Sequence, residues 1–234
     1  MSLPNVVIKN KRLINIRRSR LLENDLKIEP TENGANNLAR YSEVAQYQIL
    51  DQWCWNAVGS SLCEYFLGEN VGGRKVQSNN AVQYIQDAKG KCASINVPGH
   101  GEIKYWVPYM KQGEPIHYKA GNVACNKPNW PQLITNGTQK LHSEWVWHKK
   151  GPEEKDKQRV IAELEKGNPV GMYINWGPGR GAHVVTIYGS YKHDGHDVFN
   201  FADPYIGLES ARGAPSGGVW AGSLVTRKIV VEEK

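Results

Sequence analysis

Cys54, His183 and Asp203 follow one another in an order that suits a cysteine nucleophile, its base and a partner for that base. The reactive form of cysteine is the thiolate, and an imidazole that accepts the thiol proton supplies it. A carboxylate beside the imidazole fixes which ring nitrogen carries the proton. The three residues lie far apart along the chain, so they meet only if folding brings them together. Their types and order make a thiol hydrolase the leading hypothesis.

The sequence around Cys54 predicts a helix that begins at or near this residue. Apolar residues recur from Val58 to Leu67 at the i, i+3, i+4 spacing of a buried amphipathic helix. Asp51 and Gln52 come just before it and are predicted to cap it. A cysteine in the first turn faces backbone N–H groups and the positive end of the helix dipole, which favour the thiolate. The alternative is that Cys54 is a small buried hydrophobe, the usual role of an isolated cysteine.

Gln48 stands shortly before Cys54 and carries an amide that can donate a hydrogen bond to a developing oxyanion. The backbone N–H of Cys54 would be the second donor, and such donors act on charge that exists only in the transition state. Gln46 and Gln52 are close in sequence and are alternatives for the same role. We predict that Gln48 is the donor.

Residues 181–205 are predicted to form a β-hairpin. Two stretches that alternate in polarity flank Asp194-Gly195, a dipeptide typical of a two-residue turn. The returning strand would carry Asp203 back to the neighbourhood of His183. The alternative for Asp203 is structural, because Asp followed by Pro commonly starts a turn.

At these residues the chain resembles the papain-like cysteine peptidases, and in particular a bacterial branch that includes papain-fold effector proteases and double-glycine leader peptidases. The resemblance rests on Gln48, the run Trp53-Cys54-Trp55, His183 before an apolar strand, and Asp203-Pro204. His183 follows Cys54 by about 130 positions, as in the papain type. The resemblance covers roughly residues 40–210. It implies an α+β fold in which an N-terminal helical lobe carries the Cys, a C-terminal antiparallel sheet carries the His and Asp, and a cleft lies between them.

The resemblance implies cleavage of peptide bonds through a thioester on Cys54, with a protein or peptide as substrate and no cofactor. Two departures leave the substrate open. Papain itself has Asn where this chain has Asp203, and the CGSCW-type signature is absent, with Asp51-Gln52-Trp53 in its place. Two alternatives remain beside the peptidase. One is an acyl-transferring or deamidating enzyme, since another nucleophile can resolve a thioester, and the other is a papain-fold binding module without activity.

Two parts of the chain are predicted: an N-terminal extension and linker over residues 1–38, and a catalytic domain over residues 39–234. Six basic residues between Lys9 and Arg20 equal the formal net charge of +6, so the basicity is local. Such a block can bind nucleic acid or acidic lipid. No aromatic residues are interleaved with it, however, and no nucleic-acid partner is expected. The extension is interpreted either as a removable pro-segment or as a targeting or solvated tail.

The composition indicates a soluble protein, with 40% hydrophobic residues and a mean hydropathy of −0.56. No stretch approaches the roughly 20 apolar residues that span a bilayer. A standard signal peptide is also not recognised, so a cytoplasmic location and non-classical export both stay open. The sequence does not predict an oligomeric state.

Besides Cys54 the chain has three cysteines. Cys63 is predicted to be buried in the same helix, and a disulfide between Cys92 and Cys125 stays open because spacing does not fix pairing. The ligand spacings of a structural zinc site do not occur. Residues 193–197 contain two His and two Asp, but the Asp-Gly at their centre favours a hairpin tip over a metal site.

Further elements are predicted with less detail. Helices are expected over residues 79–88 and 155–166, a strand over residues 170–176, and a loop-rich region over residues 93–150. Residues 177–181 are rich in glycine, but they precede a strand and lack a Lys-Ser/Thr pair. Phosphate binding is therefore not expected there.

Overall fold

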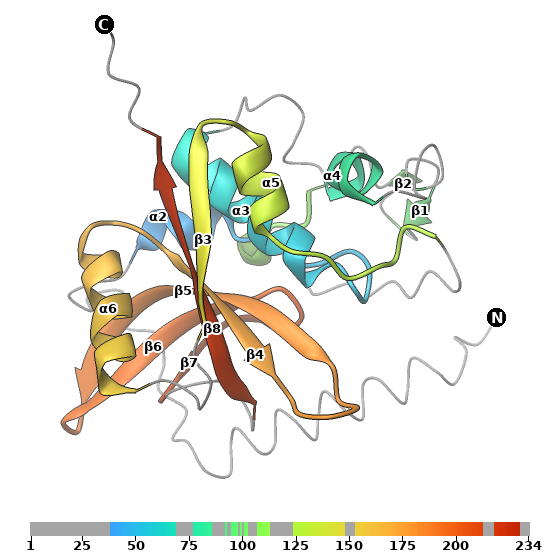
Figure 1. Cartoon of the computed structure of the whole chain (residues 1–234). Helices are drawn as coiled ribbons and strands as arrows, with labels where there is room; N and C mark the ends of the chain where they lie inside the picture. The colour runs from blue at the N-terminus through green and yellow to red at the C-terminus, as the bar shows by residue number, and fades with distance from the viewer. Residues whose placement is uncertain are drawn as a thin grey trace, which may run out of the picture.

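The computed structural model describes residues 38–68, 77–85, 92, 95–97, 99, 101–102, 107–112, 124–147, 153–212 and 218–229. The basic N-terminal block lies outside the described residues. Within them, the N-terminal part is mainly helical and the C-terminal part is built on an antiparallel sheet, as Figure 1 shows. The predicted α+β arrangement, with Cys54 on the helical part and His183 and Asp203 on the sheet, is confirmed.

Five α-helices and one short 3-10 helix are described. They are α2 (Ala39–Val44), α3 (Cys54–Leu67), α4 (Gln77–Tyr84), η2 (Met110–Gln112), α5 (Gln132–Gly137) and α6 (Glu154–Glu165). The helix α3 begins at Cys54, as predicted. The predicted helices over 79–88 and 155–166 correspond to α4 and α6, although residues 86–88 lie outside the described residues.

The main sheet has six strands in the order β3-β8-β4-β5-β6-β7, and every neighbouring pair is antiparallel. The strands are β3 (Leu141–Trp147), β4 (Val170–Asn175), β5 (Ala182–His193), β6 (His196–Asp203), β7 (Gly207–Ala211) and β8 (Val219–Lys228). A separate pair joins β1 (Asn96–Val97) to β2 (Gly101–Glu102). The region 93–150 was predicted to be loop-rich, and this is wrong for α5 and for β3, which forms one edge of the sheet.

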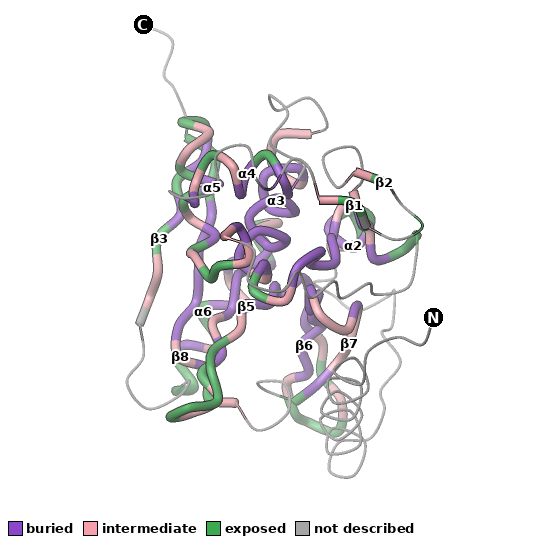
Figure 2. The backbone as a smooth tube through the Cα atoms, turned by 90° about the vertical axis from the view of Figure 1, so that its right-hand side faces the viewer, coloured by how far each residue is buried: buried purple, intermediate pink, exposed green. Residues whose placement is uncertain are grey.

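The two faces of the sheet support different cores. Neighbouring residues in a strand point to opposite faces, and accordingly Val184 belongs to the cluster under α3 and α5 whereas Val185 belongs to the cluster under α6. Figure 2 shows buried residues, in purple, along α3 and the middle strands. Each fully buried side chain of this kind contributes about 1.5–3 kcal/mol. The sheet is thus fixed from both sides, and α3 is held against one of them.

The start of α3 differs from the prediction in its capping. Trp53 is the N-cap residue, with φ −99° and ψ 22°, and no side chain within the described ranges caps the helix. Asp51 and Gln52 form a turn before the N-cap, so the prediction that they cap α3 is wrong. The reason is that other residues already hold this turn. The Gln48 side chain bonds to the carbonyl of Asp51, and the Asn126 side chain accepts the N–H of Gln52.

The β5–β6 hairpin is confirmed. His193 pairs with His196 around a two-residue turn in which Asp194 has φ 50° and Gly195 has φ 75°. Two positive φ values are the mark of a type I′ turn, which Asp-Gly accommodates. The turn fixes the register of the hairpin, and the register brings the first residues of β5 beside the last residues of β6.

Candidate active site

Cys54 is the first residue of α3 and is partly exposed, whereas Cys63, Cys92 and Cys125 are buried. All four cysteines are free thiols, so Cys92 and Cys125 are not bridged in this structure. The prediction that Cys63 is buried in α3 is confirmed. Among the four, Cys54 combines access to solvent with a helix N-terminus, the setting that favours a reactive thiolate.

His183 and Asp203 lie at the open end of the β5–β6 hairpin and are joined by a hydrogen bond. The distance from His183 Nε2 to Asp203 Oδ1 is 2.7 Å. The same carboxylate oxygen accepts the backbone N–H of Tyr205 at 2.8 Å. Asp203 therefore does two things at once: it holds the Asp-Pro turn and it fixes the imidazole ring.

The structure also brings Cys54 close enough to His183 for the Cys54 side chain to raise the pKa of the imidazole. Since Nε2 faces Asp203, Nδ1 is the ring nitrogen left for the sulfur. Burial lowers the pKa of His183, but the charge of Asp203, its hydrogen bond and the interaction with Cys54 outweigh burial and raise this pKa from 6.5 to about 10. His183 is therefore expected to be protonated, as an imidazolium, near neutral pH.

Two hydrogen bonds join the helical part to the hairpin near these residues. The backbone N–H of Gln48 donates to the carbonyl of Pro204 at 2.8 Å. The Tyr41 hydroxyl donates to Thr186 Oγ1 at 2.8 Å. The turn that follows Asp203 is thus bonded directly to the segment that leads into α3.

The Gln48 side chain is buried and braces the turn before Cys54. Its Nε2 donates to the carbonyls of Leu50 at 3.0 Å and of Asp51 at 2.7 Å. Its Oε1 is buried and has no hydrogen-bond partner among the residues that the structure describes. Gln46 is committed elsewhere, because its Nε2 bonds to Glu64 Oε2 at 3.3 Å.

Sequence reasoning missed a segment that lies beside Cys54, residues 124–130. The indole N–H groups of Trp53 and Trp55 donate to the carbonyls of Cys125 and Lys127 at 2.7 Å and 3.1 Å. Two tryptophans on either side of a cysteine were the available signal, because a buried indole requires an acceptor for its N–H.

Aromatic rings gather where this segment meets the sheet. The Trp130 ring contacts those of Trp145 and Tyr173, with ring centroids 5.9 Å and 5.7 Å away. Burial raises the pKa of Tyr173, and the charge of Cys54 raises it further. The aromatic cluster of these three residues therefore lies close to the thiol.

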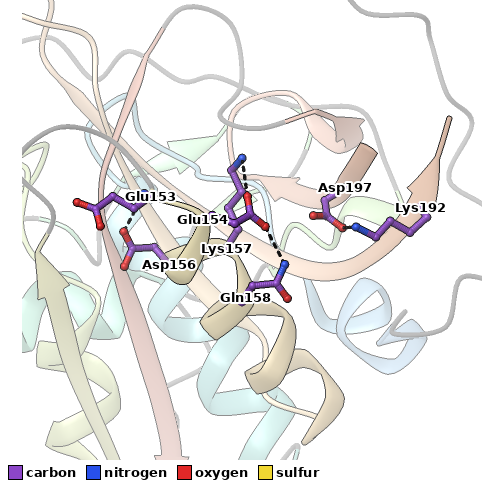
Figure 3. A network of polar contacts seen from close by, with 7 residues as sticks. All are labelled: Glu153, Glu154, Asp156, Lys157, Gln158, Lys192 and Asp197. Atoms are coloured by element: carbon purple, nitrogen blue, oxygen red, sulfur yellow. Dashed lines mark hydrogen bonds and ion pairs between the residues drawn. The ribbon is translucent and has the colours of Figure 1, made fainter. Parts of the chain in front are cut away.

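The hairpin tip carries ion pairs. Lys192 Nζ lies 2.6 Å from Asp197 Oδ1, and Asp194 contacts both His193 and Arg212. Figure 3 shows Lys192 and Asp197 beside the first turn of α6, where Glu153 and Asp156 form a capping box. Among the described residues, no three His, Cys, Asp or Glu side chains are placed to hold a metal ion.

No helix within the described residues has both the length and the apolar character needed to cross a membrane.

No protein-family model matches the chain, and no curated protein matches it. Solved structures that match it include those of the mite allergens Blo t 1 and Der p 1 (12% identity, 85% of this chain and 73% of that chain, TM-score 0.37). Another is procathepsin B of Trypanosoma congolense, with 13% identity over 92% of this chain and 89% of that chain and a TM-score of 0.41. A third is the Pseudomonas avirulence protein AvrPphB, with 10% identity over 84% of this chain and 93% of that chain and a TM-score of 0.26. These proteins are papain-like cysteine peptidases, the class that the motifs resemble.

Proposed function

We propose that the chain is a thiol hydrolase that cleaves peptide bonds through a thioester on Cys54. The observation that carries the proposal is the arrangement around one imidazole. His183 Nε2 lies 2.7 Å from Asp203 Oδ1, and the side chain of Cys54 lies close enough to raise the pKa of the same ring. A nucleophile bonded to a base that a third group orients is the arrangement used for covalent catalysis.

The residues divide the steps of the reaction between them. The Cys54 thiolate attacks the carbonyl carbon of the scissile amide and forms a tetrahedral oxyanion. The proton on His183 Nδ1 then passes to the amide nitrogen, the C–N bond breaks, and the amine leaves with the thioester in place. Water attacks the thioester while Nδ1 accepts its proton, which releases the acid and restores the thiolate and imidazolium. Asp203 keeps its hydrogen bond to Nε2 throughout.

The oxyanion requires donors, and we propose the Cys54 backbone N–H and the Gln48 side-chain amide. The helix N-terminus supports the first, since its N–H groups point toward negative charge. For the second, Gln48 lies in the turn before Cys54, and its Nε2 bonds to Leu50 and Asp51. One of these two bonds has to be exchanged for a bond to the oxyanion in the transition state.

A comparison of products tests this function. A proteome is incubated with the wild-type protein and with Cys54→Ala, and new N-termini are measured by mass spectrometry. New N-termini that appear only with wild type are expected. Ammonia release or amine incorporation without new N-termini would instead indicate the deamidating or acyl-transferring enzyme. Absence of any product, with Cys54 alkylated no faster than a free thiol, would contradict an active enzyme.

A further inference from the structure

Three residues around Cys54 are bonded to three consecutive residues far along the chain. Trp53 Nε1 donates to the carbonyl of Cys125 at 2.7 Å, and Trp55 Nε1 donates to that of Lys127 at 3.1 Å. Between them, the backbone N–H of Gln52 donates to Asn126 Oδ1 at 3.0 Å. We call these three hydrogen bonds the tryptophan clamp.

The clamp is built from groups that have no easy alternative partner. Both indole rings are fully buried, and Cys125 is fully buried as well. An indole nitrogen only donates, so a buried indole N–H without an acceptor carries the full cost of desolvation. The carbonyl of Cys125 would likewise lose its hydrogen-bond donor if the Trp53 bond were lost. No disulfide shares this task, because Cys125 is a free thiol.

The clamped segment leads directly to the aromatic cluster beside the thiol. Trp130 follows Cys125 by five residues and its side chain is 39% exposed. Its ring contacts that of Tyr173 on β4. Burial raises the pKa of Tyr173, and the charge of Cys54 raises it further, so Tyr173 lies close to the thiol. Residues 125–130 therefore lie between the turn that carries the nucleophile and the sheet that carries its base.

We propose that Trp53 and Trp55 are positioning residues whose clamp makes residues 125–130 a fixed wall of the substrate-binding surface. The proposal rests on the proposed peptidase function. On this proposal an extended peptide bound at Cys54 contacts this segment, whereas a small alkylating reagent need not. The clamp should consequently matter for binding an extended peptide and not for the reactivity of the thiol.

The first test follows the Cys125 thiol and does not depend on peptidase activity. It uses the Cys54→Ala background, so that the reagent reports only on the three buried cysteines. Trp53→Phe keeps a ring but removes the N–H, and we expect native-state alkylation of Cys125 to rise about tenfold. Alkylation of Cys63 and Cys92 should stay within twofold of the parent.

Trp220→Phe is the matched control, because the Trp220 indole is also buried and donates to the carbonyl of Gly222 at 2.8 Å, in the core under α6. It removes the same chemical group without touching the clamp, and Cys125 should remain protected. The proposal is overturned if Cys125 reacts no faster in Trp53→Phe than in Trp220→Phe. It is also overturned if all three cysteines become reactive together, since the bond would then support general stability only. Trp55→Phe, tested in the same way, covers the case in which Trp53→Phe does not fold.

The second test separates peptide binding from thiol chemistry. With Cys54 present, Trp53→Phe should raise KM for an extended peptide about tenfold, with kcat and the rate of Cys54 alkylation by iodoacetamide within twofold of wild type. A fall in kcat at unchanged KM would overturn the role in substrate binding. If no peptide is cleaved by wild type, the proposed function fails, while the labelling of Cys125 still decides whether the clamp exists.

Discussion

The two parts of the candidate site are held in place by different kinds of bond. His183 and Asp203 belong to neighbouring strands, and the backbone ladder of β5 and β6 sets their positions. Cys54 begins a helix whose approach, residues 46–53, is held mainly by side chains that bond to backbone groups. A ladder of backbone bonds survives most side-chain changes, whereas a buried side-chain bond is lost with its residue. The thiol side of the site should therefore be the more sensitive to single substitutions.

The helical part depends on buried side-chain hydrogen bonds most clearly between α3 and α4. Asn56 Nδ2 donates to the carbonyl of Gln77 at 2.7 Å, and Gln77 Nε2 donates to the carbonyl of Tyr47 at 2.7 Å. Gln77 Oε1 in turn accepts the N–H of Ile49 at 3.1 Å. Asn56 and Gln77 are fully buried, so each bond replaces water that is no longer available.

Among substitutions in the sheet, Asp203→Ala should have the largest effect on turnover. It removes the hydrogen bond to His183 and leaves the backbone hydrogen bonds between β5 and β6 in place. We expect turnover to fall by about 10²- to 10⁴-fold, as for other orienting carboxylates. Asp203 helps to raise the pKa of His183 to about 10. Without it the imidazolium loses its proton at lower pH, so the alkaline limb of the kcat/KM profile, where His183 must still donate a proton to the leaving amine, should move to lower pH. The measurement is kcat/KM from pH 5 to 11. An unchanged limb would make Asp203 only a turn residue, and Asp203→Asn should be milder than Asp203→Ala.

Gln48→Ala should lower kcat by about 10²- to 10³-fold, the usual cost of removing an oxyanion donor. The acidic and alkaline limbs of the kcat/KM profile should stay at the same pH, since His183 and Asp203 keep their contacts. Steady-state kinetics across pH measures both quantities. Full activity in Gln48→Ala, together with a crippled Gln52→Ala, would move the oxyanion donor to Gln52.

Asn56→Ala should lower the free energy of unfolding by about 2–3 kcal/mol, because it leaves the Gln77 carbonyl buried without its donor and removes an acceptor of the Asn80 amide. Urea denaturation followed by circular dichroism measures the loss. If the cost is below about 0.5 kcal/mol, the contrast between a side-chain-held and a ladder-held part does not apply to this network.

Lys192→Met should have the smallest effect, at most about 0.5–1 kcal/mol, although its ion pair with Asp197 is short at 2.6 Å. The Lys192 side chain is 66% exposed, and the turn and ladder of the hairpin do not depend on it. The same denaturation measurement should show the larger loss for Asn56→Ala. If Lys192→Met lowered the free energy of unfolding more than Asn56→Ala, the helical part would not be the more sensitive of the two.

The sequence predicted the parts in which local pattern and structure agree. The apolar spacing after Cys54 predicted α3, and alternation around Asp194-Gly195 predicted the hairpin. The strand β3 was missed although Leu141 and Ser143 point inward and His142 and Glu144 outward. The short run of alternation was hidden in a region that otherwise lacks regular pattern.

What the sequence could not predict depends on contacts between distant residues. Nothing local pairs Trp53 with Cys125, and Asp51 looked like a cap because capping is normally a local matter. The Gln48 amide has local partners, but whether it braces the turn or faces the oxyanion is decided by tertiary packing. Such contacts become visible only in the folded chain.

The order of the reacting residues along the chain has a consequence for biosynthesis. Cys54 leaves the ribosome about 7–30 s before Asp203, at ordinary rates of synthesis. During that time the thiol has neither its imidazole nor the carboxylate that orients it, because both belong to a hairpin that is not yet made. On the proposed mechanism, activation of Cys54 by His183 requires the hairpin to dock on the helical part, so a nascent chain lacks the activated thiol until then.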